Sequence, residues 1–220
     1  MILHIANALD AADLAAVSEV ARQARFEDGR STAGAGARVV KRNEQAVDDV
    51  PLRGLLELVE QRLARHPLVQ AAALPRCFVR LMLSRYGPGM AYGNHIDAAL
   101  IGNRRSDLSF TLGLDSGQDY RGGDLVLVEP SGERRWHIAA GELLLYPSTF
   151  LHRVEPVTSG MRLVVVGWIT SRVRSAEQRE LLFDLSRSVR EEREQRGKTD
   201  QYDRLDRVHQ NLMRRWVDGD

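Results

Sequence analysis

The chain has 220 residues, of which 43% are hydrophobic and 28% are charged, and 31 basic against 30 acidic residues give a net charge of +1. This composition is typical of a soluble globular domain and excludes wholesale disorder. The balanced charge and the lack of a long apolar run argue against a nucleic-acid or membrane partner. A lone cysteine cannot form an intrachain disulfide and the N-terminus has no secretory leader, so we expect a cytoplasmic protein.

Two helices are predicted before residue 76. Acidic residues open the segment 10–25, where apolar residues recur on one helical stripe, and a proline opens the segment 51–65, which is rich in leucine. Between them, the small residues of segment 31–36 could be mistaken for a phosphate-binding loop. They lack its Lys-Ser/Thr ending and a preceding strand, so we expect a flexible flank of the active site.

Between residues 76 and 170 the pattern changes to short β runs separated by turn residues. The predicted strands are segments 78–86, 108–114, 125–128, 134–138, 143–146 and 161–169. Many short strands at this spacing are typical of a jelly roll, whose two sheets can enclose a ligand. We therefore predict a mainly β fold with flanking helices, built on a double-stranded β-helix (jelly roll) core.

The segment beyond residue 174 is predicted to be helical again. Ser175 and Gln178 have the spacing of a capping box at the start of one helix, and apolar residues at helical spacing mark one side of this helix and of a last one. These residues are Leu181, Leu182, Leu185 and Val189, then Leu205, Val208, Leu212 and Trp216. We predict a jelly-roll domain with N-terminal helices at 1–174 and a C-terminal helical extension at 175–220.

Two histidines and an aspartate form a candidate metal site. Residues i and i+2 of a β-strand point to the same side, so His95 and Asp97 can reach one metal. His152 lies between two strand-like runs and can supply a third ligand from another strand. Two imidazoles and one carboxylate on one face of Fe(II) leave positions open for substrate and oxygen. Each of these three residues, taken singly, also fits a structural role. For His137, which is not part of this site, we expect a structural role.

Arg162 lies ten residues past His152, in a run that is apolar on both faces and predicts a buried strand. A buried guanidinium needs a partner, because an unpaired buried charge is costly, and the run itself contains no acid. Pairing with one of the 30 acidic residues elsewhere is one explanation. We prefer a ligand carboxylate held bidentately, as 2-oxoglutarate supplies when its keto acid end chelates iron.

Further motifs extend along the chain. They include Asp28-Gly29-Arg30, Lys41-Arg42-Asn43-Glu44-Gln45, Arg85-Tyr86-Gly87-Pro88-Gly89-Met90, Gly122-Gly123-Asp124-Leu125, Tyr146-Pro147-Ser148, Leu151-His152-Arg153-Val154 and Arg214-Arg215-Trp216. With these residues the chain resembles, over nearly its whole length, the PKHD-type hydroxylases. These are a bacterial branch of the prolyl 4-hydroxylase-like Fe(II)/2-oxoglutarate dioxygenases.

The resemblance implies that His95, Asp97 and His152 bind Fe(II) and that Arg162 grips the distal carboxylate of 2-oxoglutarate. It implies hydroxylation of an amino-acid, peptidyl or peptide-like substrate, with release of succinate and CO2. L-ascorbate as an additional cofactor and a homodimer are both compatible with it.

Tyr86 and Tyr92 match the tyrosines that flank the 2-oxoglutarate pocket in such enzymes, although ordinary core packing also explains either ring. The chain departs from the family at Ala98, where asparagine is usual, at Phe110, where a small residue is typical, and at Gly113, where an aromatic residue is typical. We expect these changes to spare the metal site and to alter the substrate pocket.

Two alternatives belong to other functional classes. One is a cupin-like metal-binding protein without oxygenase activity, which would not need Arg162 as an anchor opposite the metal. The other is a non-catalytic sensor that binds iron and 2-oxoglutarate and acts on a partner through the helical extension. Formation of succinate together with a modified substrate would exclude the sensor.

Overall fold

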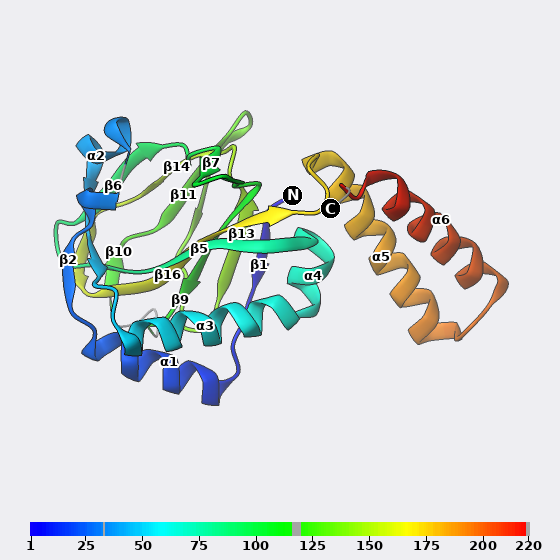
Figure 1. The fold of residues 1–220 in the computed structure, drawn as a ribbon, viewed down its shortest axis with the longest axis horizontal. Helices are drawn as coiled ribbons and strands as arrows, with labels where there is room; N and C mark the ends of the chain where they lie inside the picture. Colours follow the sequence, from blue (N-terminus) through cyan, green and yellow to red (C-terminus); the bar gives the residue numbers. More distant parts are fainter. Residues whose placement is uncertain (33, 116–119, 219–220) are drawn as a thin grey trace.

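Two antiparallel sheets that face one another form the centre of the protein (Figure 1). The computed structural model describes residues 1–32, 34–115 and 120–218. The larger sheet contains, in spatial order, β1 (Leu3–Ile5), β13 (Leu143–Pro147), β9 (Leu108–Gly113), β16 (Arg162–Ser171), β5 (Pro75–Tyr86), β4 (Glu44–Ala46) and β2 (Phe26–Asp28). The smaller sheet contains β12 (Gly132–Trp136), β11 (Leu125–Glu129), β14 (Leu151–Val154), β6 (Ala91–His95) and β3 (Lys41–Arg42). Two short ribbons pair β10 (Tyr120–Gly122) with β15 (Val157–Gly160) and β7 (Leu100–Ile101) with β8 (Arg104–Arg105).

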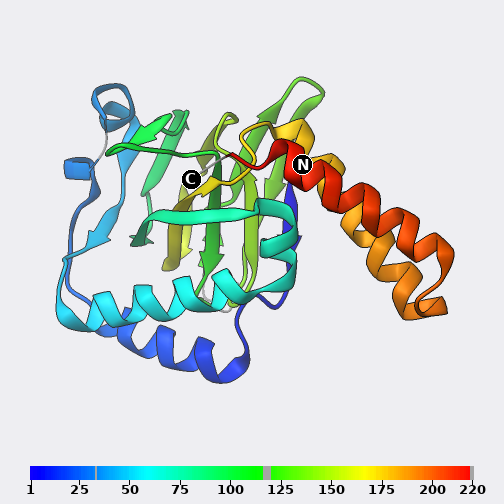
Figure 2. The same cartoon turned by 45° about the vertical axis from the view of Figure 1, so that its right-hand side comes forward.

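Helices cover the outer face of the larger sheet (Figure 2). These are α1 (Ala11–Gln23), α3 (Val50–Arg65) and α4 (Pro67–Ala73), whereas the 3-10 turn η1 (Gly29–Thr32) and α2 (Ala35–Val40) lie near β3 and β6. One hydrophobic cluster joins the helices to the sheet and includes Val17, Val59 and Val165. A second cluster packs between the sheets, with Leu127 on one side and Leu144 on the other. The predicted mainly β jelly roll with flanking helices is confirmed.

Both predicted N-terminal helices are present and begin at aspartate caps. The Asp10 carboxylate accepts the amide of Asp13 at 2.8 Å, and the Asp49 carboxylate accepts that of Leu52 at 3.0 Å. Helix α4 was not predicted. Its first residue, Pro67, follows almost directly on the end of α3, so a proline that marks the end of one helix also starts the next.

We expected segment 31–36 to be a flexible flank of the active site, but it contains regular structure. The Thr32 hydroxyl donates to the Gly29 carbonyl at 3.0 Å, which stabilises the η1 turn, and α2 begins at Ala35. Ala33 lies outside the described residues. The prediction therefore missed a turn and a short helix.

The six predicted strands are confirmed as β5, β9, β11, β12, β13 and β16, with shifted ends. Strands β6 and β14, which pair with each other inside the smaller sheet, were not among the predicted strand segments, although His95 and His152 were expected to lie on strands. Both strands are short and carry polar side chains such as Asn94, His95 and Arg153, so neither presents the apolar run by which strands are recognised.

The C-terminal segment forms a helical hairpin of α5 (Ala176–Arg196) and α6 (Asp200–Trp216), which projects from the jelly roll (Figure 1). The capping prediction is confirmed, because the Ser175 hydroxyl accepts the Gln178 amide at 3.3 Å. The apolar side of the hairpin is less buried than its spacing suggests. Leu181 is 58% exposed and Val208 is 46% exposed. No helix in the described chain combines the length and apolar character needed to cross a membrane.

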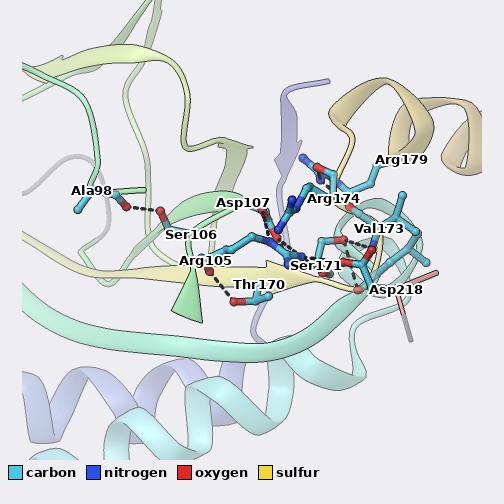
Figure 3. Close-up of polar contacts among 11 residues, drawn as sticks. Ala98, Arg105, Ser106, Asp107, Thr170, Ser171, Val173, Arg174, Arg179 and Asp218 are labelled. Carbon is cyan, nitrogen blue, oxygen red and sulfur yellow. Dashed lines mark hydrogen bonds and ion pairs between the residues drawn. The ribbon is translucent and has the colours of Figure 1, made fainter. Parts of the chain in front are cut away.

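A polar network fastens the C-terminal segment to the jelly roll (Figure 3). Arg105 of β8 pairs with Asp107 at 3.3 Å and with Asp218, which follows α6, at 3.1 Å. The same guanidinium donates to the Ser171 carbonyl at 3.1 Å, and Asp107 accepts the Ser171 amide at 2.9 Å. The end of the chain is thus held against the end of β16.

Arg179 of α5 is a buried part of this junction, with 3% of its surface exposed. Its guanidinium donates to the Val173 carbonyl at 2.7 Å and to the Arg174 carbonyl at 2.8 Å (Figure 3). Burial lowers the pKa of Arg179 below its ordinary value. The side chain therefore fixes the turn between β16 and α5 by satisfying two backbone acceptors.

Replacing Arg179 by methionine should lower the free energy of unfolding by about 3 kcal/mol, because two carbonyls lose their charged donor. Urea unfolding of the wild type and the variant measures the difference. Arg190→Met changes an exposed arginine of the same helix and is the matched control, with an expected effect below about 0.5 kcal/mol. Equal stabilities for Arg179→Met and Arg190→Met would contradict this role.

Candidate active site

Two histidines face each other across neighbouring strands of the smaller sheet. His95 ends β6 and His152 lies in β14, and the two residues are direct partners in the antiparallel register. Their ring centres are 4.1 Å apart. The predicted third ligand therefore comes from a different strand, and strand pairing alone brings its imidazole beside the first.

Asp97 joins the two histidines from the loop that follows β6. Because the strand ends at His95, the expectation that both residues share one strand is wrong. The Asp97 carboxylate lies 3.8 Å from His152 Nε2 and accepts a hydrogen bond from the Ser109 hydroxyl at 2.6 Å. Ser109 is itself 2.8 Å from the Ser148 hydroxyl. Ser109 of β9, supported by Ser148 in the turn after β13, thus holds the Asp97 carboxylate, and both serines are buried.

Backbone carbonyls fix the orientation of both imidazoles. His95 Nδ1 is 2.8 Å from the Gly93 carbonyl, and His152 Nδ1 is 3.0 Å from the Phe150 carbonyl. A carbonyl can only accept a hydrogen bond, so each Nδ1 carries a proton, and Nε2 is the ring nitrogen available to a metal. Such outer hydrogen bonds are typical of histidines that bind metals.

The three side chains offer a ligand set suited to a divalent metal. Their ligand atoms all lie within 4.8 Å of one another. Burial, followed by the nearby His152, lowers the pKa of His95 to about 4, so this imidazole is neutral at neutral pH. Two imidazoles and one carboxylate fit Fe(II) with open coordination positions.

Arg162 begins β16 and is buried, with 1% of its surface exposed, as the apolar run predicted. Its guanidinium lies 5.2 Å from the centre of the Tyr86 ring, and Tyr86 is its cross-strand partner in β5. Arg162 Nε has no hydrogen-bond partner, and no residue in the described part of the chain forms a salt bridge with this guanidinium. A buried cation with an unused donor fits a ligand carboxylate.

A cavity of about 770 Å³ between the sheets contains all six predicted site residues. They are Tyr86, Tyr92, His95, Asp97, His152 and Arg162. Tyr92 stacks on His95, with ring centres 3.6 Å apart and ring planes at 12°. Burial raises the pKa of Tyr86, so its hydroxyl stays neutral.

The cavity also contains polar residues that we did not predict as site residues, namely Lys41, Asn43 and Arg80. Trp168 forms part of the wall, and its Nε1 and Asn43 Oδ1 are buried without a hydrogen-bond partner. Lys41 and Asn43 belong to a motif that carried the family resemblance, which was the one available signal. Their positions depend on strand pairing that sequence spacing does not reveal.

The departures from the family pattern lie at or near this cavity. Phe110 lines it and packs over Gly167, where an added Cβ would stand 2.5 Å from the Phe110 ring. Gly113 admits no larger side chain, because a Cβ there would lie 2.1 Å from the Ala139 carbonyl oxygen. The exposed Ala98 lines the entrance, and its carbonyl accepts a hydrogen bond from Ser106 (Figure 3).

His137 lies apart from the three candidate ligands and does not line the cavity. Its Nδ1 is 2.9 Å from the Asp124 carboxylate, and its ring packs 4.3 Å from that of Tyr120.

Comparisons with known proteins agree with this geometry. Residues 81–170 match the 2OG-Fe(II) oxygenase superfamily, and residues 177–218 match the PKHD-type hydroxylase C-terminal domain. A PKHD-type hydroxylase of Acaryochloris marina is 45% identical over 99% of this chain and 100% of its own length. Another, of Parvibaculum lavamentivorans, is 49% identical over 98% of this chain and 99% of its own length.

Solved structures show the same fold at low sequence identity. A prolyl-4-hydroxylase of Pseudomonas putida has a TM-score of 0.55 and 22% identity, with 78% of this chain and 92% of that chain covered. A 2OG-Fe(II) oxygenase family oxidoreductase of Burkholderia pseudomallei has a TM-score of 0.58 and 18% identity, with 76% and 82% covered. The chain therefore belongs to the PKHD-type hydroxylases, which are enzymes of the 2OG-Fe(II) oxygenase superfamily and use Fe(II) and 2-oxoglutarate.

Proposed function

We propose that His95, Asp97 and His152 hold the Fe(II) of this enzyme and that Arg162 binds the distal carboxylate of 2-oxoglutarate. The convergence of the three ligand atoms within 4.8 Å, in a cavity that also contains a buried arginine, carries this proposal. Bound iron and 2-oxoglutarate supply the oxidising chemistry, with succinate and CO2 as products of the cosubstrate. The chain's own residues orient the reactants.

Several backbone and side-chain groups prepare the ligands before the metal binds. The Gly93 and Phe150 carbonyls accept Nδ1–H of each histidine and so turn Nε2 toward the cavity side as the metal-binding atom, and Ser109 orients the Asp97 carboxylate. Tyr92 restricts rotation of the His95 ring by stacking on it. Preorganisation of this kind lowers the cost of ordering the ligands around a cation.

The cavity walls suit a reaction that must exclude water. Leu125, Val154, Val166 and Phe110 contribute apolar surface near the candidate ligands. We propose that the substrate is an amino acid, a peptide or a peptide-like molecule. The similar Pseudomonas putida protein is a prolyl-4-hydroxylase, which supports proline-containing peptides as first candidates, and free amino acids and siderophores are further candidates.

We further propose that residues 1–174 are the catalytic unit and residues 175–220 a helical extension, of which 219 and 220 lie outside the described part. The separate family matches at 81–170 and 177–218 support this division.

A cytoplasmic location, a homodimer and an ascorbate requirement stay predictions. Membership of the oxygenase superfamily argues against the cupin-like alternative without oxygenase activity.

Anaerobic protein with Fe(II) and 2-oxoglutarate should show the visible charge-transfer band of a chelated keto acid. In Arg162→Ala, half-saturation of the band should need at least about tenfold more 2-oxoglutarate, because a charge-assisted anchor is lost. Iron content measured without cosubstrate should not change. A variant that binds 2-oxoglutarate like the wild type would contradict the role of Arg162.

His152→Ala should abolish iron retention after gel filtration, because two protein ligands do not hold the cation. His137→Ala is the matched control and should retain iron, since this histidine lies outside the ligand group. Metal content of both variants gives the answer. Equal losses would show that the third ligand is misassigned.

Ser109→Ala should weaken Fe(II) binding by about 10- to 100-fold, because Asp97 loses the hydrogen bond that orients it. Competition with a chromogenic chelator measures the affinity. Ser84→Ala changes another buried serine of the larger sheet that does not line the cavity, and it should leave the affinity unchanged. The same loss in both variants would point to general destabilisation.

The enzyme should release succinate in proportion to a substrate that gains one oxygen. A screen of free amino acids, proline-containing peptides and siderophores, read by mass spectrometry, tests this. Binding of 2-oxoglutarate without coupled product from any class would favour the sensor alternative.

A further inference from the structure

The cavity contains two cations that the binding of iron and 2-oxoglutarate does not use. Lys41 of β3 and Arg80 of β5 line it from opposite sheets. Asp97 is the sole carboxylate among the cavity-lining residues that the structure describes, and it is assigned to the metal. The two cations therefore have no acidic neighbour of their own in the cavity wall.

Lys41 is almost completely enclosed, with 4% of its surface exposed. Its Nζ donates to the Thr32 hydroxyl at 3.1 Å and lies 5.3 Å from the centre of the Tyr92 ring. Tyr92 in turn stacks on His95, so the ammonium lies one ring away from a candidate metal ligand. Burial, followed by Arg80, lowers the pKa of Lys41 to about 8, which leaves it charged at neutral pH.

Arg80 stands cross-strand from Trp168, which also lines the cavity. Its side chain is exposed, and its guanidinium makes no hydrogen bond or ion pair with another described residue. Lys41 and Arg80 line the same cavity, and the charge of Arg80 is a secondary cause of the lowered pKa of Lys41. An arginine fork and a lysine ammonium are both typical carboxylate-binding groups.

The charge balance of the cavity with iron and 2-oxoglutarate bound also favours an anionic ligand at Lys41 and Arg80. The two positive charges of Fe(II) offset the dianion of 2-oxoglutarate, and Arg162 offsets Asp97. Asp28, outside the cavity wall, also acts on Lys41 but is ion-paired with Arg30. Lys41 and Arg80 then have no carboxylate of their own in the cavity, and screening by water is weak at the enclosed Lys41. A neutral substrate would leave both without a carboxylate partner.

We propose that Lys41 and Arg80 form an anion subsite that binds a carboxylate of the substrate. This inference rests on the proposed function, because it requires 2-oxoglutarate to occupy Arg162. An amino acid or a peptide brings such a carboxylate as its C-terminal group or as an aspartate or glutamate side chain. The subsite would select acids over amides of the same shape and would hold the substrate beside the metal.

Binding of matched acids and amides tests the subsite. The probes are a pool of N-acetylated amino acids and dipeptides, each present as the free acid and as the primary amide. The protein is loaded with Mn(II) and N-oxalylglycine, which replace the reactive pair, and retained ligands are identified by mass spectrometry after ultrafiltration. The wild type should retain at least one acid about tenfold or more over its amide.

Lys41→Met and Arg80→Gln should each abolish this preference, whereas Arg42→Gln, which changes the exposed neighbour of Lys41 outside the cavity, should keep it. Because Arg80 is exposed, its variant is informative even if Lys41→Met folds poorly. The 2-oxoglutarate titration of the visible band should stay unchanged in Arg80→Gln, in contrast to Arg162→Ala.

Equal retention of acids and amides, or retention of neither, would overturn the subsite. So would a loss of 2-oxoglutarate affinity in Lys41→Met as large as that in Arg162→Ala, because Lys41 would then belong to the cosubstrate anchor. Failure of the proposed function gives a different result from failure of the subsite. In that case the wild type with Fe(II) and 2-oxoglutarate would show no charge-transfer band, before any probe is added.

Discussion

The candidate metal centre depends on two hydrogen bonds between imidazoles and the backbone. His95 and His152 each donate Nδ1–H to a carbonyl two residues earlier, at 2.8 Å and 3.0 Å. These bonds fix the tautomer of both rings, and the pairing of β6 with β14 fixes their separation. The remaining ligand, Asp97, is then placed by Ser109 from the opposite sheet.

The jelly roll and the chemistry of its ligands could be predicted from the sequence, because strand rhythm and residue types are local signals. The placement of Asp97 was misread, since β6 ends two residues earlier and a serine distant in sequence orients the carboxylate. Lys41 and Arg80 were missed for a related reason, because their shared cavity exists only once β3 and β5 lie in facing sheets. The apolar spacing of α6 likewise could not reveal that its Val208 stays exposed.

The site and the helical hairpin are connected through one short region of chain. The loop from Asp97 to Asp107 contains cavity-lining residues at its start and Arg105 near its end, and Arg105 pairs with Asp218 beyond α6. The Arg105–Asp218 ion pair thus connects the C-terminal helices to a segment that also lines the cavity. Phe110 and Gly113 follow in β9, where the close approaches to Gly167 and Ala139 determine which side chains fit.

An anaerobic crystal structure with Mn(II) and 2-oxoglutarate would show which atoms bind the metal. We expect one metal at about 2.2 Å from Nε2 of His95, Nε2 of His152 and an Asp97 oxygen, with Arg162 on the distal carboxylate. Both Nδ1 atoms should keep their carbonyl partners. A metal bound through Nδ1, or held by other residues, would contradict this ligand assignment.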